Sequence, residues 1–239
     1  METKKRFNGK ALYQPSGKAG EYAGWAVNFY TGCSNNCDYC YCKRGVMAHV
    51  WSNRPHLKKC FKSEFYAFSI FKKEVEQNIE DVRKSGLLLS FTTDPLLPET
   101  MELTFATIVY CYRSDIPVSV LTKCTDWSHS DRFDTLTYLN HKEKIAFGFT
   151  LTGHDEMEPG APSNTERIKL MQNLHTLGFK TFASIEPVID IDSAESMIRA
   201  SEPYCDLFKI GLRSGVKKDY LDKKEVSDFV QWFDFCIDR

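Results

Sequence analysis

The sequence predicts an α/β fold built around a mainly parallel β-sheet. Six short apolar segments of strand length alternate with segments that have the periodicity of helices, and this alternation is typical of parallel sheets. The chain has 239 residues, the size of one large domain, and contains no repeat or linker that would divide it. We therefore expect a single domain over residues 1–239, with a core at about 25–212 and a C-terminal helix at about 224–237.

The six expected strands are short runs of apolar and β-branched residues. They cover residues 25–30, 87–91, 118–122, 145–151, 180–185 and 206–210. Right-handed crossover connections between them would make neighbouring strands parallel. A barrel and a doubly wound open sheet fit this alternation equally well. In both, ligands bind at the carboxyl ends of the strands.

The expected helices are recognised by their apolar periodicity and by the residues that bound them. Phe68, Phe71, Val75 and Ile79 follow one another at intervals of three or four, which predicts an amphipathic helix over residues 65–83. The remaining helices are expected at residues 99–112, 165–177, 193–200 and 224–237. Gly178 marks the end of the third of these five helices.

Four of the nine cysteines lie within ten residues, directly after the first expected strand. Cys33, Cys37 and Cys40 have the spacing Cys-x3-Cys-x2-Cys, which places three thiolates on one tight loop. Three protein thiolates leave one iron of a [4Fe–4S] cubane without a protein ligand. S-adenosylmethionine (AdoMet) can bind that iron, and an electron from the cluster can then cleave its sulfonium bond to give a 5′-deoxyadenosyl radical.

A structural zinc site and an electron-transfer cluster are the competing interpretations of these cysteines. Structural zinc sites favour two cysteine pairs separated by a longer interval, and the sequence has no second pair downstream. Cys42 could supply a fourth thiolate, but the interval Cys40-x-Cys42 is too short for an unstrained tetrahedral loop. The spacing therefore favours a cluster with an open iron.

The spacing Cys-x3-Cys-x2-Cys resembles the signature of the radical SAM superfamily, and Tyr39 matches the aromatic residue before its last cysteine. The resemblance implies a partial (β/α)6 barrel, a [4Fe–4S] cluster and AdoMet as cofactors, and a position for Tyr39 near the adenine. It also implies an electron donor of the flavodoxin or ferredoxin type.

Between residues 28 and 191 the chain further resembles the spore photoproduct lyase-like group, which is of the DNA-repair type. The matching segments are residues 37–41, 91–94, 120–123, 149–150, 157–162 and 166–168. The resemblance implies that Lys123 and Thr150 bind the AdoMet carboxylate and that Thr93 lines the same pocket. An ammonium group and hydroxyl groups at strand ends suit a carboxylate ligand. The implied substrate is a nucleobase or nucleic acid, and the implied activity is that of a lyase or a modifying enzyme.

Two positions depart from this group. Phe91 stands where the lyase has the cysteine that returns hydrogen to the substrate, so a thymine-dimer lyase of the spore type is not expected. Tyr41 matches a tyrosine of the same hydrogen transfer, and we expect it to relay a radical. Glu186 ends the fifth strand, where an apolar or small residue is usual. We expect it to bind a substrate cation or the AdoMet ribose, or to pair with a basic neighbour such as Lys209 or Arg213. We also expect Arg213 on the substrate side.

Charge and targeting signals limit the partners. The formal net charge is −1, so no global positive field attracts a phosphate backbone. No signal peptide and no apolar stretch long enough for a membrane span is visible, which predicts a cytoplasmic protein without a membrane partner. The alternatives are radical modification of a small molecule or peptide, and a non-catalytic iron–sulfur protein for electron transfer or sensing.

Overall fold

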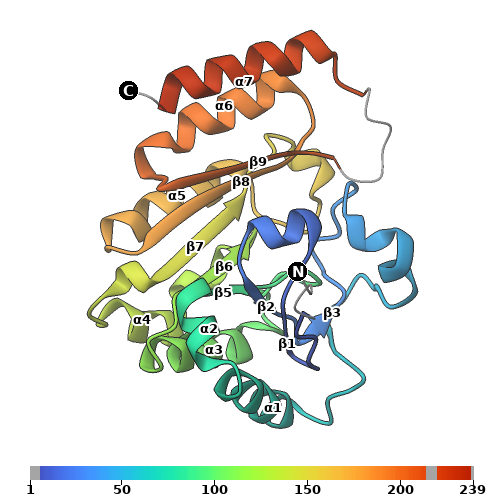
Figure 1. The fold of residues 1–239 in the computed structure, drawn as a ribbon. Coiled ribbons are helices and arrows are strands. Elements are labelled where there is room, and N and C mark those ends of the chain that lie inside the picture. Colours follow the sequence, from blue (N-terminus) through green and yellow to red (C-terminus); the bar gives the residue numbers. More distant parts are fainter. Residues whose placement is uncertain (1–5, 214–219, 238–239) are drawn as a thin grey trace, which may run out of the picture.

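A computed structural model describes residues 6–213 and 220–237, and its central feature is a seven-stranded sheet (Figure 1). The strands, in their order across the sheet, are β1 (Leu12–Tyr13), β2 (Trp25–Val27), β5 (Leu87–Leu89), β6 (Val118–Thr122), β7 (Ile145–Thr150), β8 (Lys180–Val188) and β9 (Leu207–Leu212). β1 is antiparallel to β2, and the six strands from β2 to β9 pair in parallel. The spatial order follows the chain order without the reversal that a doubly wound sheet requires. The predicted partial (β/α)6 barrel is confirmed.

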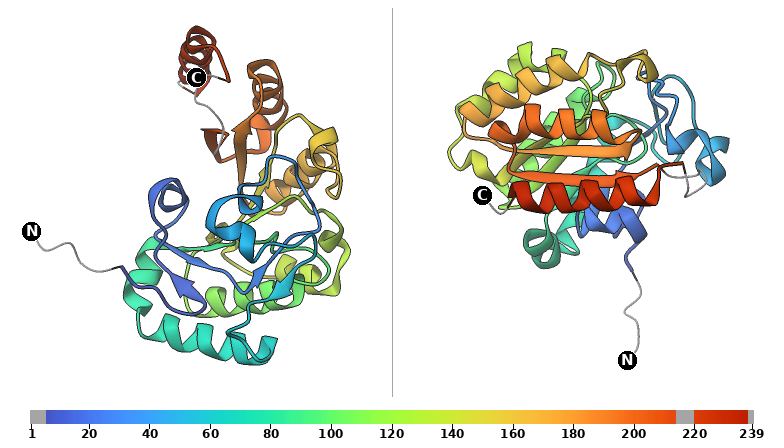
Figure 2. Two further views of the ribbon diagram at one scale, coloured as in Figure 1. Left: turned by 90° about the vertical axis from the view of Figure 1, so that its right-hand side faces the viewer. Right: turned by 90° about the horizontal axis from the view of Figure 1, so that it is seen from above.

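The helices lie around the outside of the curved sheet, as the two views of Figure 2 show. They are α1 (Glu64–Glu76), α2 (Ile79–Ser85), α3 (Met101–Arg113), α4 (Asp131–Thr137), α5 (Asn164–Thr176), α6 (Ile191–Ser201) and α7 (Lys223–Ile237). Short 3-10 helices are η1 (Gly17–Glu21), η2 (Tyr41–Lys43), η3 (Gly45–His49), η4 (Asp126–His129), η5 (Lys142–Lys144), η6 (Asp155–Met157) and η7 (Glu202–Tyr204). None of the helices in the described part of the chain is long and apolar enough to cross a membrane.

Two predicted elements are each divided in the structure, in both cases at an asparagine. The single helix expected at 65–83 is wrong, because α1 ends at Glu76 and α2 begins at Ile79. The Asn78 side chain donates to the carbonyl of Glu74 at 2.9 Å and so satisfies a free carbonyl at the end of α1. The strand expected at 25–30 ends at Val27, where the Asn28 side chain accepts from the Phe91 amide at 2.8 Å.

Residues after that break form a small second sheet. β3 (Tyr30–Thr31) pairs antiparallel with β4 (His56–Leu57) and leads into the cysteine segment, residues 33–42. β1, β4 and α4 are elements that the sequence patterns do not predict, because each of the two strands has only two residues and α4 has no clear apolar periodicity.

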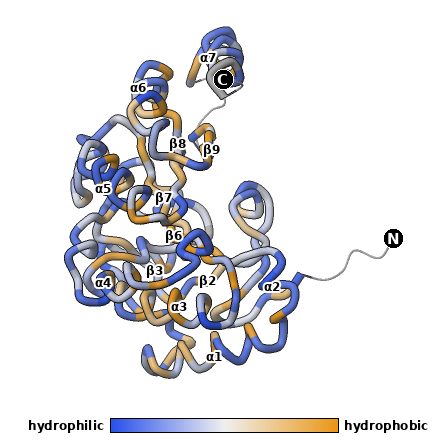
Figure 3. The backbone as a smooth tube through the Cα atoms, turned by 90° about the vertical axis from the view of Figure 1, so that its left-hand side faces the viewer, coloured by the Kyte–Doolittle hydropathy of each residue, from blue (hydrophilic) through white to orange (hydrophobic). Residues whose placement is uncertain are grey.

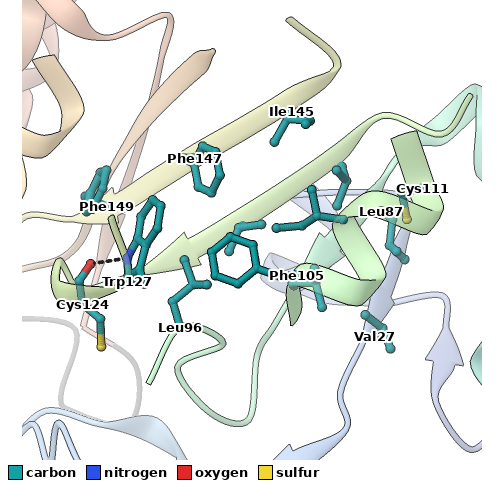
Figure 4. Close-up of a cluster of buried hydrophobic side chains, with 14 of the residues drawn as sticks. Val27, Leu87, Leu96, Phe105, Cys111, Cys124, Trp127, Ile145, Phe147 and Phe149 are labelled. Atoms are coloured by element: carbon teal, nitrogen blue, oxygen red, sulfur yellow. Dashed lines mark hydrogen bonds between the residues drawn. The ribbon is translucent and has the colours of Figure 1, made fainter. Parts of the chain in front are cut away.

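The main hydrophobic core lies between the outer face of the sheet and the helices (Figure 4). The Trp127 ring stacks on Phe147 of β7, with ring centres 5.0 Å apart, and its Nε1 donates to the Cys124 carbonyl at 2.7 Å. The hydropathy pattern of Figure 3 agrees with this arrangement, since the strands are mostly apolar and the helices are polar on their outer sides.

The inner face of the barrel is filled by a smaller apolar cluster of Ala26, Leu88 and Phe182. The Phe182 ring occupies the space above Gly148, where an added Cβ would lie 2.1 Å from the ring. This cluster closes the interior partway along the strands. The space at their carboxyl ends is left for a ligand.

Candidate functional site

A cavity of about 560 Å³ opens at the carboxyl ends of the parallel strands. This volume is within the usual range for small-molecule sites. Its wall is made by strand ends, by the cysteine segment and by residues 13–22, which we call the N-terminal segment. The lining residues used below are Tyr22, Cys33, Cys37, Tyr39, Cys40, Tyr41, Cys42, Phe91, Thr93, Asp94, Lys123, Thr150, Ser184, Glu186 and Leu212. Nine of the ten residues selected from the sequence therefore face one cavity, and Arg213 is the exception.

The cysteine segment turns sharply out of β3 at Gly32. Gly32 has a φ of +86°, and an added Cβ would lie 2.3 Å from the carbonyl oxygen of Arg54, so the turn requires glycine. The three cysteines of the motif follow this turn and line the cavity. Among the residues that the structure describes, no three His, Cys, Asp or Glu side chains converge as ligands of a single metal ion do. A cubane needs no such convergence, because each thiolate binds a different iron.

The thiols of this segment differ in their electrostatic surroundings. Burial raises the pKa of Cys33 to about 12 and also raises the pKa of Cys37. A hydrogen bond with the Cys42 thiol lowers the pKa of Cys40 to about 6. Because metal ligands must be thiolates, Cys33 and Cys37 would have to lose their protons to bind a metal cluster.

Asp94, at the end of the segment after β5, joins the cysteine segment to the neighbouring strand. Its Oδ2 accepts from Asn35 Nδ2 at 2.8 Å and from the Lys123 amide at 2.7 Å. Its Oδ1 accepts from Thr122 Oγ1 at 2.6 Å and from the Leu96 amide at 3.0 Å. In the sequence, Asp94-Pro95 indicates no more than a turn that ends a strand, so this role of Asp94 could not be recognised from that pair alone. An aspartate at a strand end beside a predicted ligand loop was the available signal.

Behind the wall of the cavity lies a buried carboxylate, Glu158, between η6 and α5. Its Oε2 lies 2.6 Å from Nη2 of Arg167, and both side chains are fully buried. Its Oε1 accepts a hydrogen bond from the Tyr39 hydroxyl and lies 3.9 Å from Nζ of Lys123. Burial and the charge of Glu158 raise the pKa of Tyr39 well above its ordinary value, so the phenol remains a donor. Burial would lower the pKa of Lys123, but the charges of Cys37 and Glu158 outweigh it and raise this pKa.

The three residues expected to bind the AdoMet carboxylate lie at or just beyond the carboxyl ends of neighbouring strands. Lys123 follows β6, and its side chain is 15% exposed. Thr150 ends β7 and is buried, with its carbonyl bound by Nη1 of Arg167 at 2.9 Å. Thr93 lies in the segment after β5, and its carbonyl accepts from Ser90 Oγ at 2.8 Å. All three line the cavity.

Glu186, within β8, meets the N-terminal segment and not the basic residues that were considered as its partners. It accepts a hydrogen bond from the Tyr22 hydroxyl, which also lies 2.9 Å from Ser184 Oγ. Burial and the hydrogen bond to Glu186 raise the pKa of Tyr22 well above its ordinary value. Lys209 donates to the carbonyl of Glu21 at 2.7 Å. The pairing of Glu186 with Lys209 that the sequence left open is therefore wrong.

Arg213 lies just beyond β9. Its amide donates to the Tyr220 hydroxyl at 2.8 Å. Leu212 lines the cavity, whereas Arg213 is not among the described lining residues. The structure therefore does not bring its side chain together with Glu186, the other residue expected on the substrate side.

Tyr41 and Cys42 both contact the carbonyl oxygen of Phe91. The Tyr41 hydroxyl donates to this oxygen, and the Cys42 thiol lies 3.6 Å from it. Tyr41 is 50% exposed and Cys42 is buried. The Phe91 ring meets Tyr22 edge-on, with ring centres 6.0 Å apart.

The fold and the site define a class of protein, in which a partial barrel presents a loop of three cysteines to a cavity at its strand ends. The family model described as the radical SAM superfamily matches residues 27–202, and the chain belongs to this superfamily. Members are enzymes that use a [4Fe–4S] cluster and AdoMet. The residues present fit both groups, because three thiols of one loop share the cavity with an ammonium and with hydroxyls suited to a carboxylate.

Two similar proteins are found by sequence and by structure. An uncharacterized protein of Methanocaldococcus jannaschii, MJ0683, is 23% identical over 194 residues, which are 78% of this chain and 69% of that protein. The fold is similar to that of Streptococcus suis SuiB bound to precursor peptide SuiA, with a TM-score of 0.55 and 13% identity. That match covers 87% of this chain and 46% of the SuiB chain, so this chain spans about half of SuiB.

Proposed function

We propose that Cys33, Cys37 and Cys40 hold the [4Fe–4S] cluster and leave its fourth iron open to AdoMet. The observation that carries this proposal is that the three cysteines come from one loop and face the same cavity as Lys123 and Thr150. When bound, the cluster and AdoMet supply a 5′-deoxyadenosyl radical able to abstract hydrogen from an unactivated C–H bond.

The chain's own residues bind and orient AdoMet. The Lys123 ammonium and the Thr150 and Thr93 hydroxyls bind its carboxylate, since charge-assisted hydrogen bonds to a carboxylate are strong in a site shielded from water. The Tyr39 ring, buried beside the cysteines, packs near the adenine.

The substrate lies toward the side of the cavity lined by Tyr22, Ser184 and Glu186. Glu186 binds a cationic or hydrogen-bond-donating group of the substrate, or the AdoMet ribose. Arg213 directly follows the lining residue Leu212 and is a second proposed substrate contact, from outside the cavity wall. We propose that Tyr41 relays a radical, and its hydrogen bond to the carbonyl of Phe91, the position where the lyase has its cysteine, supports this role. A phenylalanine side chain has no hydrogen suited to this transfer, so the proposal is a spore photoproduct lyase-like enzyme with a different reaction.

The substrate class that the motif resemblance supports is a nucleobase or nucleic acid. A peptide is the second candidate, because the structural neighbour SuiB is described as bound to a precursor peptide. Oligonucleotides and peptides supplied to the reconstituted enzyme would separate these classes by which one increases 5′-deoxyadenosine formation. Binding to oligonucleotides at two salt concentrations adds a check, since phosphate contacts weaken steeply with salt.

Anaerobic reconstitution with iron and sulfide, followed by dithionite and AdoMet, tests the catalytic proposal. We expect 5′-deoxyadenosine from the native chain and none from a Cys40→Ala variant. A stable cluster without 5′-deoxyadenosine would refute the proposal and favour an electron-transfer or sensing protein. Glu186→Gln tests the proposed role of Glu186 in binding substrate or AdoMet. Unchanged turnover of AdoMet and of substrate would indicate that Glu186 has a structural role only. A flavodoxin or ferredoxin is the proposed physiological reductant.

A further inference from the structure

The buried pair of Glu158 and Arg167 is fixed firmly behind the cavity. Besides the 2.6 Å contact with Glu158, Arg167 donates to the carbonyl oxygens of Thr150 at 2.9 Å and Pro162 at 2.6 Å. Neither Glu158 nor Arg167 is among the described residues that line the cavity. Burying two charges costs more than packing apolar side chains in the same place, so stability alone does not account for the pair.

The second oxygen of Glu158 faces two groups that do line the cavity. The Tyr39 hydroxyl donates to Oε1, and Nζ of Lys123 lies 3.9 Å from it. Nζ of Lys123 also lies 5.5 Å from the centre of the Tyr39 ring, within the range of a cation–π contact. Tyr39 belongs to the cysteine segment and Lys123 follows β6, so one carboxylate links two separate parts of the wall.

The turn that carries Glu158 is itself bound to the cysteine segment. The Asp38 amide donates to the Met157 carbonyl at 2.9 Å, and the Gly160 amide donates to the Asn35 carbonyl at 3.1 Å. These bonds lie on either side of Glu158 in the sequence. The carboxylate is therefore held in register with the loop that bears the cysteines.

From these contacts we infer that Glu158 is a positioning residue for AdoMet, which holds the Tyr39 ring and the Lys123 ammonium in their binding orientations. The inference rests on the proposed assignment of Tyr39 and Lys123 to AdoMet. A lysine has a flexible four-carbon stem, and holding it in place before the ligand arrives reduces the entropy lost on binding. A separation of 3.9 Å is longer than a hydrogen bond, so the ammonium keeps its donors for an incoming carboxylate.

The test compares Tyr39→Phe with Tyr30→Phe in the reconstituted holoenzyme. Tyr39→Phe keeps the ring and the ion pair with Arg167 but removes the hydrogen bond to Glu158. Tyr30→Phe is the matched control, because its buried hydroxyl donates to Glu64 and its side chain is not among those lining the cavity. We expect Tyr39→Phe to raise the AdoMet Kd about tenfold, the size of one lost hydrogen bond to a charged group. The control should bind AdoMet like the native chain.

A double variant, and the split between KM and kcat, separate positioning from general damage. Glu158→Gln should also raise the Kd and KM for AdoMet, with kcat at saturating AdoMet within about twofold of the native value. Tyr39→Phe removes only its contact with Glu158, which Glu158→Gln alters as well. The double variant Tyr39→Phe/Glu158→Gln should therefore bind AdoMet no more weakly than the single variant that binds it less tightly. If Glu158→Gln does not fold, Tyr39→Phe still decides.

Native affinity in Tyr39→Phe, or equal losses in Tyr39→Phe and Tyr30→Phe, would overturn the inference and leave the proposed function intact. A native chain that carries a cluster but binds no AdoMet would overturn both. Iron content and thermal denaturation, measured on each variant, show whether the protein compared is folded and loaded.

Discussion

Gly160→Ala should damage the cysteine segment although residue 160 is not one of the proposed ligands. An alanine Cβ at this position would lie 2.1 Å from the carbonyl oxygen of Ser34 and 2.9 Å from the Cα of Asn35. The first distance is about 1.3 Å short of the 3.4 Å at which ordinary contact begins. Both neighbours are backbone atoms, so no side chain can rotate away. Either the turn or the cysteine segment must move by about an ångström, and overpacking of this kind costs about 1–3 kcal/mol.

The measurement is iron and sulfide content after anaerobic reconstitution, together with thermal denaturation of the metal-free chain. We expect Gly160→Ala to retain well under half of the native cluster content, because a site loses function when its ligands shift by more than about 0.5 Å. Gly20→Ala is the control, since its Cβ would lie 3.3 Å from the Pro15 carbonyl oxygen, close to ordinary contact. Native iron content and an unchanged Tm in Gly160→Ala would refute the reasoning.

The remaining predictions concern three other positions. Asp94→Asn should lower the free energy of unfolding by about 2–4 kcal/mol and weaken cluster retention, because an amide NH2 would face donors that now meet a carboxylate; urea denaturation measures the first effect. Cys42→Ala should keep a full iron content, and loss of the cluster would contradict the three-cysteine site. Burial would lower the pKa of His154, but its hydrogen bonds to Glu156 and Asp190 raise it above 6.5. The stability contributed by His154 is therefore complete below pH 6.5 and lost as the pH rises through the folded-state value. His154→Gln should then lower Tm at pH 6 and have little effect at high pH, and a pH-independent difference would contradict this.

The fold could be predicted from the sequence because its strands are short apolar runs, each bounded by a clear signal. Residues 118–122 form β6 with the bounds that the pattern predicts. The choice between a barrel and an open sheet could not be predicted from these patterns, since the alternation of strands and helices does not determine strand order. It came from the resemblance carried by the cysteines and was confirmed by the sheet order. The two divided elements show what pattern reasoning misses, because the asparagine side chains act through hydrogen bonds to partners that only the folded chain reveals.

The site residues that could be predicted are those whose side chains by themselves indicate a chemical role. The thiols of the cysteine segment and the ammonium of Lys123 are recognisable one at a time. Tyr22 was not, because its relevance depends on the N-terminal segment folding back onto β8, more than 160 residues away. Asp94 also depends on partners from two other segments, so its sequence neighbourhood suggested no more than a turn.

The buried charges of the site indicate how it reaches its working geometry. Asp94 and Glu158 are both buried and both contact protein groups. Asp94 accepts four hydrogen bonds, and Glu158 forms an ion pair with Arg167 and accepts a hydrogen bond from Tyr39. Leaving either without its partners would cost several kcal/mol, so their partners are fixed once the chain folds. Those partners include the backbone of Lys123 and the side chains of Asn35 and Tyr39. The walls around the cysteines are therefore set by folding itself, and loading the cluster has to organise the thiols within a frame that already exists.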